Sequence, residues 1–260
     1  MQKETVSIYV VSHKPTQLLT NDEAYHLIQA GASTHEKFCA LTDDSYQGNI
    51  SYKNESWCEL TAAHWIWKNA TSDIVGLCHY RRYFTTRTGW IIKCLTGINT
   101  CILSTRKIRL LMRKYDAIVT QTERSDIPIG PRYAGGHIGK DLTTTRQVLT
   151  EMHPSYIPAF DQVMSGYYYD FANMVIARRE VYQKYCSWLF PLLEEIERRT
   201  DLTGYSPYQI RVFGFLAERL QRVWMLTNGI KIKRMPIIQT EDSNCFTRIW
   251  REYNEKRKIT

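Results

Sequence analysis

Short runs of apolar, often β-branched residues alternate with longer segments of helical periodicity along most of the chain. The short runs predict buried strands at residues 6–11, 38–41, 74–78, 116–120, 172–177 and 230–238. Apolar positions three and four apart predict helices at residues 56–69, 141–152, 179–199 and from about 207 to 228. Strands that alternate with helices in this way predict an α/β fold, with a mainly parallel central sheet flanked by helices.

Capping signals locate the ends of these helices. Ser56 and Glu59 have the spacing of a capping box, so a helix should begin at Ser56. Pro154 and the pair 228–229 (Asn-Gly) should each end a helix, and Pro191 should make the helix at 179–199 irregular. Because no linker or repeat interrupts the pattern, we predict one domain over residues 1–260, with 85–165 as a basic, helical elaboration.

The composition is that of a globular protein with a surplus of positive charge. Apolar residues make up 43% and charged residues 23%, which excludes a disordered chain. A net charge of +8 favours polyanions, nucleotide phosphates or an anionic membrane as partners, and solubility alone is the alternative. Seven cysteines without a C-x-x-C pair argue against a disulfide framework and against a zinc site. We expect neither a signal peptide nor a membrane span, because a strand follows soon after Met1 and no run of 18 uncharged apolar residues occurs.

Residues 89–114 differ from the rest of the chain, because they contain no acidic residue among many isoleucines and leucines. This composition is typical of a basic amphipathic segment that lies on an anionic membrane surface. The segment has six cations, which are Lys93, Arg106, Lys107, Arg109, Arg113 and Lys114.

Polar groups follow three of the predicted strands, at His13-Lys14, at Asp43-Asp44 and at residues 79–82 (HYRR). Ligands of open α/β sheets bind beyond the carboxyl ends of the strands, so we expect these groups to converge. Carboxylates can bind sugar hydroxyls and guanidiniums can bind a diphosphate, so a sugar nucleotide would suit such a crevice. Solvated strand ends and Asx turns are the structural alternatives.

The side chains after the third strand should alternate between two faces. His79 and Arg81 should lie on one face and Arg82 on the other. The chain has no D-x-D pair, which metal-dependent sugar-nucleotide enzymes use to hold an ion on the diphosphate. We therefore expect no cofactor and no metal, with fixed positive charge in place of the ion. Asp43-Asp44 keeps a metal site as an alternative.

Two carboxylates are candidates for the base that would take a proton from an acceptor hydroxyl. Asp170 precedes a predicted strand, and Glu218 lies in a predicted helix seven residues after Arg211, hence on the same face. Gly214 between Arg211 and Glu218 would leave room for close approach, and a buried structural ion pair is the alternative.

Two more of the seven histidines, His64 and His137, have informative neighbours. His64 lies between aromatic residues in a predicted helix, which is typical of a core position. Tyr133, His137 and Asp141 are four residues apart and could form a polar patch on one helical face, and Gly135-Gly136 leaves the start of that helix open. We take Tyr133, His137 and Arg211 as candidates for the acceptor side of the site.

Several unusual blocks of the sequence resemble a bacterial family first named as a domain of unknown function, whose members occur in capsule and O-antigen gene clusters. The blocks occur in family order over residues 6–236, and they are IYVVSHKP, LTDDSYQGNISYKN, ELTAAHWIWKN, IVGLCHYRRYF, NMVIARREVYQKYCSWLF and GFLAERL. The resemblance implies a GT-A-like glycosyltransferase that transfers a sugar, galactofuranose in some relatives, from a UDP-sugar with inversion. The acceptor it implies is a surface glycan on a polyprenyl diphosphate, so the segment 90–114 would hold the enzyme on the inner face of the cytoplasmic membrane.

The resemblance also implies which residues bind the substrates. Asn173 would lie near the sugar or the acceptor. The implied donor-site residues are His13, Lys14, Asp44, Asn49, Asn54, His79, Arg81 and Arg82. The chain departs from the family at Gly48, where family members have a carboxylate just before the asparagine, and in a longer, more basic segment 89–114.

Two other kinds of protein are compatible with parts of this pattern. A nucleic-acid-binding protein would use the basic charge and the aromatic residues, but the sequence contains no recognised nucleic-acid motif, so we expect no nucleic-acid partner. A scaffold that binds a sugar nucleotide without catalysis would have the same binding residues as the enzyme. Release of UDP in the presence of donor and lipid-linked acceptor would distinguish the enzyme from the scaffold.

Overall fold

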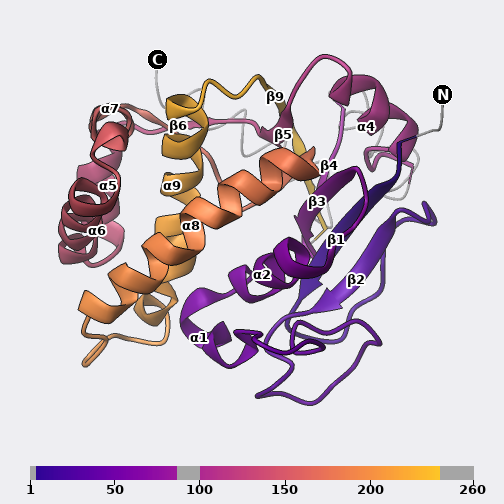
Figure 1. Cartoon of the computed structure of the whole chain (residues 1–260), viewed down its shortest axis with the longest axis horizontal. Helices are drawn as coiled ribbons and strands as arrows, with labels where there is room; N and C mark the ends of the chain where they lie inside the picture. Colours follow the sequence, from indigo (N-terminus) through magenta and orange to yellow (C-terminus); the bar gives the residue numbers. More distant parts are fainter. Residues whose placement is uncertain (1–3, 87–99, 241–260) are drawn as a thin grey trace, which may run out of the picture.

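The computed structural model describes residues 4–86 and 100–240, which form an eight-stranded sheet with helices on both faces (Figure 1). One continuous path through the sheet has the order β10-β4-β3-β8-β5-β9, and β1 joins β3 to β2. The strands are β1 (Val6–Ser12), β2 (Tyr25–Gln29), β3 (Ile74–His79), β4 (Arg82–Phe84), β5 (Ala117–Thr120), β8 (Val175–Arg178), β9 (Ile232–Met235) and β10 (Ile237–Gln239).

The sheet is mixed, although most of its strands share one direction. β1 is parallel to β2 and β3, and β5 is parallel to β9. β4 and β8 are both antiparallel to β3. β5 is antiparallel to β8, and β10 is antiparallel to β4. Six strands therefore point the same way, with β4 and β8 reversed. A separate two-stranded hairpin is formed by β6 (Glu123–Arg124) and β7 (Tyr168–Tyr169).

The described ranges contain eight α-helices, which pack on the sheet and also lie to one side of it (Figure 1). They are α1 (Asn54–Trp57), α2 (Leu60–Asn69), α4 (Thr105–Met112), α5 (Ile129–Gly136), α6 (Gly139–Met152), α7 (Ile157–Ser165), α8 (Arg179–Arg199) and α9 (Val212–Thr227). None of these helices is long and apolar enough to cross a lipid bilayer. Three short 3-10 turns lie at Ser51–Lys53, Pro154–Tyr156 and Gln209–Arg211.

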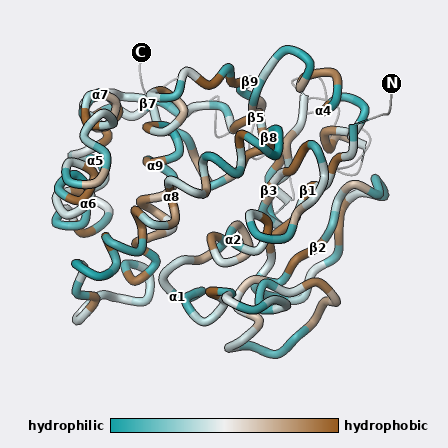
Figure 2. The backbone as a smooth tube through the Cα atoms, in the orientation of Figure 1, coloured by the Kyte–Doolittle hydropathy of each residue, from teal (hydrophilic) through white to brown (hydrophobic). Residues whose placement is uncertain are grey.

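Side chains that alternate along the strands divide the core between the two faces of the sheet. On β1, Tyr9 and Val11 pack with α2, α8 and α9, whereas Ile8 and Val10 pack on the face that carries α4. Buried residues of α6 and α7 belong to the same cluster as those of α8 and α9, so segment 129–165 shares a core with the sheet. In Figure 2, hydrophobic positions recur along the strands and helices of the interior, and hydrophilic ones along the outlying loops.

The predicted second strand at 38–41 is wrong. The second strand of the structure is β2 (Tyr25–Gln29), earlier in the sequence. Gln29 accounts for the difference, because its side chain donates to the Glu36 carbonyl and accepts the Phe38 amide, holding this segment as a loop. The only pairing near this segment is an isolated bridge between Gln29 and Thr42.

The capping box at Ser56 is also wrong. Asn54–Trp57 forms one turn of helix, and Cys58, at φ 51° and ψ −129°, separates it from α2. Glu59 turns its carboxylate to Asn173 instead of capping the helix. The helices predicted at 141–152, 179–199 and 207–228 correspond to α6, α8 and α9, whose bounds differ by up to five residues, and α8 continues through Pro191. The sequence pattern does not predict α4, α5 and α7 as separate helices.

Two smaller differences concern the ends of predicted elements. The last strand, predicted as one, divides into β9 and β10 at Pro236, which has no amide hydrogen to donate. Tyr133 and Asp141 lie on different helices, α5 and α6, with His137 between them, so these three residues do not share one helical face.

Candidate active site

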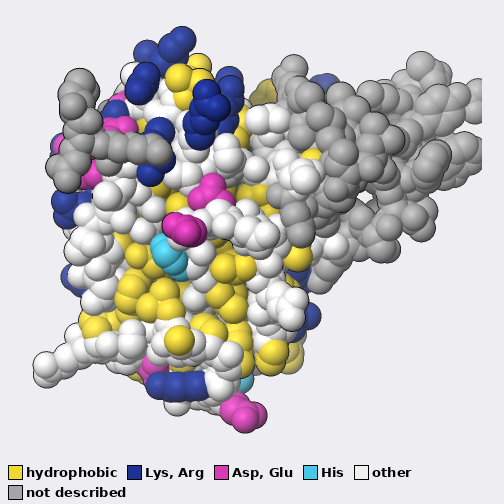
Figure 3. Space-filling view, turned by 90° about the vertical axis from the view of Figure 1, so that its right-hand side faces the viewer, with side chains coloured by type: hydrophobic (Ala, Val, Ile, Leu, Met, Phe, Trp, Pro, Cys, Tyr) yellow, Lys and Arg dark blue, Asp and Glu magenta, His cyan; other side chains and the backbone are white. Residues whose placement is uncertain are grey.

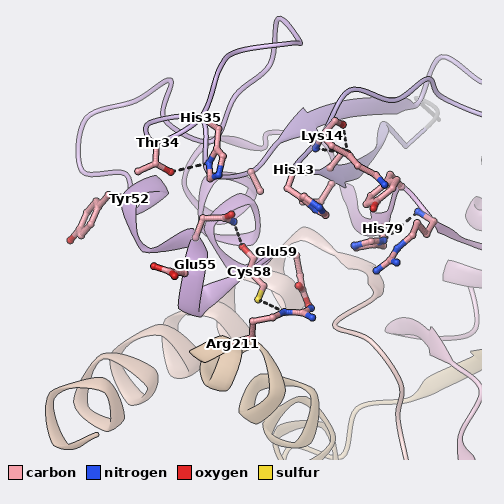
Figure 4. Close-up of a pocket in the computed structure, with 16 residues that line it drawn as sticks. His13, Lys14, Thr34, His35, Tyr52, Glu55, Cys58, Glu59, His79 and Arg211 are labelled. Atoms are coloured by element: carbon pink, nitrogen blue, oxygen red, sulfur yellow. Dashed lines mark hydrogen bonds between the residues drawn. The ribbon is translucent and has the colours of Figure 1, made fainter. Parts of the chain in front are cut away.

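A cavity of about 760 Å³ opens at the carboxyl ends of β1 and β3, where parallel strands of an α/β sheet present their loops. His13 and Lys14 follow β1, and His79 ends β3 (Figure 4). Arg81 lies in the turn after β3. The expected convergence of these four residues at one edge of the sheet is therefore observed. Thr34 and His35, from the loop after β2, also line this cavity, which we call the first cavity.

The opposite wall of the first cavity comes from the break between α1 and α2 and from the start of α9. Cys58 lies at this break, and Arg211 donates from Nε to its Sγ at 3.3 Å (Figure 4). Burial raises the pKa of the Cys58 thiol to about 12, so the sulfur stays protonated. Asn54 donates to the Cys58 carbonyl at 2.6 Å and packs against Gly31, where φ is +72° and an added Cβ would lie 2.7 Å from Asn54 Oδ1.

A second cavity of about 540 Å³ adjoins the first and shares four residues with it. The shared residues are Glu59, His79, Arg81 and Arg211. Its other walls come from four segments far apart in the sequence: the turn into β4, α5 with the residue after it, residues 169–174, and the start of α9. Arg82, Asn173 and Glu218 lie here and not in the first cavity.

Glu218 is the carboxylate whose environment is most altered in the second cavity. Its side chain is 17% exposed. Oε1 accepts the Ala172 amide at 3.1 Å, and Oε2 accepts Arg219 Nη1 at 2.6 Å. Burial raises the pKa of Glu218 to about 7, with Arg219 lowering it and nearby Glu59 raising it. A carboxylate of this kind can accept or donate a proton at neutral pH.

Two of the three histidines at the first cavity, His13 and His79, are neutral near pH 7. Burial, together with the charges of Arg82 and Arg81, lowers the pKa of His79 to about 3. Burial and the charge of Lys14 also lower the pKa of His13. His79 therefore adds no positive charge to the site near pH 7. Its Nδ1 accepts the Arg81 amide at 3.3 Å, which assigns the proton to Nε2 and makes that nitrogen a hydrogen-bond donor.

The positive charge of the site comes from lysine and arginine, held over aromatic rings. Lys14 Nζ and the Arg81 guanidinium lie 5.2 and 5.4 Å from the centre of the Tyr80 ring. The Arg82 guanidinium lies 4.5 Å from the Phe171 ring, in the second cavity. Such cation–π contacts hold a guanidinium in place without neutralising it.

Asp44 and Asn49, two implied donor-site residues, line neither cavity. Asp44 pairs with Lys37 at 2.7 Å, and Asn49 donates to the carbonyls of its own loop. The neighbouring Asp43 is buried and accepts the amides of residues 31 and 32 together with the hydroxyl of Ser51. This acidic pair therefore holds the loops behind the first cavity, and the predicted convergence of Asp43-Asp44 with the other strand ends is wrong.

Asp170, the other candidate base, is almost completely buried and lines neither cavity. Its carboxylate accepts a hydrogen bond from Arg234 Nη1 and lies 3.5 Å from Arg222. These contacts are those of the structural ion pair that was the alternative interpretation of this residue.

The candidates for the acceptor side meet at the second cavity, although Tyr133 is buried behind it. The rings of Tyr133 and His137 lie 4.7 Å apart between their centres, and His137 lines the cavity with Arg211. Asn173 is buried and donates from Nδ2 to Glu59 Oε1 at 2.7 Å and to the Gly214 carbonyl at 3.0 Å. Asn173 therefore fixes the carboxylate that the two cavities share.

Sequence reasoning missed or undervalued several residues that the fold brings here. The capping pattern predicts a structural role for Glu59, and no sequence pattern points to Tyr208, Phe215 or Arg132. Within the described ranges, Cys58 (φ 51°) and Ala172 (φ 67°) are the non-glycine residues in the left-handed region, and both line the cavities. Backbone strain of this kind concentrates at functional sites, and no sequence pattern signals it here.

In residues 4–86 and 100–240, no group of three or more His, Cys, Asp and Glu side chains is arranged to hold a metal ion. His64 is a core residue, buried between Trp67 and Phe190 as expected.

Comparison with known proteins relates this chain to a family. The chain matches a solved apo structure described as the WbbM bifunctional glycosyltransferase, with a TM-score of 0.80 over 91% of this chain and 24% identity. The chain spans 45% of the length of that protein, and the likeness shows a shared fold. No curated protein matches the sequence. The pattern of a family described as a domain of unknown function (DUF4422) matches residues 7–229, so the chain belongs to the DUF4422 family.

Proposed function

We propose that this chain is a GT-A-like glycosyltransferase that moves a sugar from a UDP-sugar to a surface-polysaccharide acceptor. The observation that carries the proposal is the junction of the two cavities. One cavity is lined by cations from the strand ends, and the other holds a carboxylate with a pKa of about 7. The likeness to WbbM, which is described as a bifunctional glycosyltransferase, supports the proposal from the side of the fold.

The donor lies in the first cavity in this proposal. Lys14, Arg81 and Arg211 neutralise the diphosphate, with Arg82 approaching from the second cavity. His79 donates a hydrogen bond from Nε2 instead of adding charge. Positive charge that is fixed before the reaction stabilises a leaving diphosphate electrostatically, which is the role that a metal ion has in other enzymes.

The acceptor hydroxyl attacks from the second cavity. Glu218 takes the hydroxyl proton as the oxygen forms its bond to the anomeric carbon of the donor sugar. The bond from that carbon to the diphosphate oxygen breaks on the opposite side, and UDP leaves with the electron pair. Because the attack is a single displacement, the configuration of the sugar inverts. Galactofuranose is the first donor sugar to test.

The acceptor in this proposal is a glycan on a polyprenyl diphosphate, reached at the inner face of the cytoplasmic membrane. Arg106 and Lys107 of helix α4, and Arg113 and Lys114 directly after it, have exposed side chains, and Leu110 is 50% exposed. Figure 3, which views the side with α4 and β2, has lysine and arginine side chains gathered at its upper edge. Each cation near an anionic leaflet contributes about 1 kcal/mol before screening. Residues 87–99, the other part of the predicted basic segment, lie outside the described ranges.

The experiment that tests the activity measures UDP release. The protein is incubated with UDP-galactofuranose and a panel of other UDP-sugars, together with glycans linked to a polyprenyl diphosphate, with Mn²⁺ or with EDTA. Release that needs both substrates supports the proposal. Binding of a UDP-sugar without release would indicate the scaffold instead, and the absence of UDP-sugar binding would reject the donor assignment.

Vesicle flotation tests the membrane contact separately. Flotation with anionic vesicles should fall with salt and fall further when Arg106, Lys107, Arg113 and Lys114 are all replaced by Gln. The matched control replaces Lys184 and Arg198, two exposed cations of α8, with Gln. Unchanged flotation of the α4 variant would reject this surface.

A further inference from the structure

Three aromatic rings, from Tyr208, His137 and Phe215, lie together at the second cavity. The ring centres of Tyr208 and His137 are 5.6 Å apart with an angle of 14° between the planes. Phe215 lies 4.1 Å from His137 and 5.2 Å from Tyr208. Tyr208 is 52% exposed, so a large part of this ring has no protein contact. We call these three side chains the aromatic shelf.

The aromatic shelf is held in place from behind. Tyr133 is buried and packs on His137 with ring centres 4.7 Å apart. Gln209, next to Tyr208 in the chain, donates from Nε2 to the Gly136 carbonyl at 3.1 Å and so ties the α8–α9 connection to the end of α5. Burial, with the charge of Arg219, lowers the pKa of His137, so its ring is neutral near pH 7 and offers an uncharged face.

The space beside the aromatic shelf is open. Gly136 lines the second cavity, and an added Cβ there would meet no atom within 4 Å. Glu218 and Arg132 line the same cavity, so polar groups lie within one site of the rings. Binding sites that combine aromatic surface with a few placed polar groups suit ligands with one apolar face and polar edges. A pyranose has this character, because its axial C–H bonds make one face apolar while hydroxyls ring its edge.

We propose that the aromatic shelf binds a pyranose ring of the acceptor, and that Tyr208 is the residue that selects it. This inference rests on the proposed function, because it assigns the second cavity to the acceptor. It adds that the acceptor presents a six-membered sugar with an uninterrupted apolar face. Tyr208 acts by positioning that ring for attack, and takes no part in proton transfer.

Saturation-transfer NMR tests the shelf without need of turnover. The full chain is saturated with UDP and mixed with methyl pyranosides of galactose, glucose, mannose, rhamnose and N-acetylglucosamine. In the wild-type protein and in Tyr208→Phe, at least one sugar should receive saturation on the protons of one ring face. Tyr208→Ala should weaken that sugar's binding roughly three- to tenfold, as expected for the loss of one aromatic contact. Tyr167→Ala is the matched control, because Tyr167 is 47% exposed and lines neither cavity.

The outcomes separate the shelf from the proposed function. Calorimetry with UDP on the same samples measures the first cavity, and UDP affinity should be equal in all four proteins. If UDP binds and Tyr208→Ala keeps the wild-type saturation pattern, or no pyranoside binds the wild type, the shelf is overturned and the donor assignment stands. If UDP itself does not bind the wild-type protein, the donor assignment is rejected, and the proposed function is rejected with it.

Discussion

Replacing Glu218 with Gln tests the proposed chemistry most directly, because the two side chains have nearly the same shape. Gln cannot take the proton of an acceptor hydroxyl, and general-base catalysis contributes about 10²- to 10⁴-fold to a rate. We expect kcat to fall by about that factor. UDP-sugar affinity should be unchanged, because Glu218 lines the second cavity and not the first. In the wild-type enzyme kcat should rise as the pH increases through about 7, since the base must be deprotonated.

The same substitution should alter how stability depends on pH. The pKa of Glu218 is raised by burial from 4.5 to about 7, so the folded protein holds this proton more tightly than the unfolded chain does. The stability from the neutral carboxyl is complete below pH 4.5 and is lost as the pH rises to about 7. The total loss is about 3 kcal/mol, because a pKa difference of one corresponds to roughly 1.4 kcal/mol. Glu218→Gln has no proton to lose here, so its stability should not show this decline.

The assays are steady-state kinetics between pH 5.5 and 8.5, and urea unfolding of both proteins at pH 5 and pH 8. Loss of turnover with a gain of relative stability at pH 8 is a combination that simple misfolding cannot produce. A variant that keeps more than a tenth of wild-type kcat would refute Glu218 as the base. A wild-type pH profile that is flat between 6 and 8 would refute the raised pKa.

Three further substitutions separate binding from architecture. Arg81→Ala should lose most turnover while the protein remains folded by circular dichroism, and near-normal activity would contradict the diphosphate role. Asp170→Ala leaves the charge of Arg234 uncompensated, so the free energy of unfolding should fall by about 3 kcal/mol or more, which a urea titration measures. Gly31→Ala places a Cβ 2.7 Å from Asn54 Oδ1 at a left-handed φ, and should cost at least about 1 kcal/mol, seen as a lower urea midpoint.

The positions of His13, Lys14, His79 and Arg81 at the first cavity could be predicted because they lie at the ends of two strands. His13 follows β1 and His79 ends β3, and these strands are parallel neighbours, so their loops lie at one edge of the sheet. A local apolar run is enough to find such strands. The helical position of Glu218 could also be predicted, because the helix around it has a clear period and a clear end.

The predictions that failed depended on side chains making contacts far along the chain. Glu59 matches a capping box, but Asn173, 114 residues away, takes its carboxylate, and no local pattern contains that partner. Asp170 stands before a strand like a catalytic carboxylate, yet Arg234 from β9 pairs with it. The aromatic residue Tyr208 lies in an irregular connection, where periodicity carries no information.

The common wall between the two cavities has a thermodynamic consequence. Arg211 and Glu59 face both, so a ligand in one compartment alters the electrostatic surroundings of the other. Thermodynamic linkage then requires reciprocity. If a ligand in the first cavity changes the affinity for a ligand in the second cavity by some factor, the second ligand changes the affinity for the first by the same factor. In the proposed reaction, the sign of this coupling would decide whether bound UDP slows or speeds the release of the glycan product.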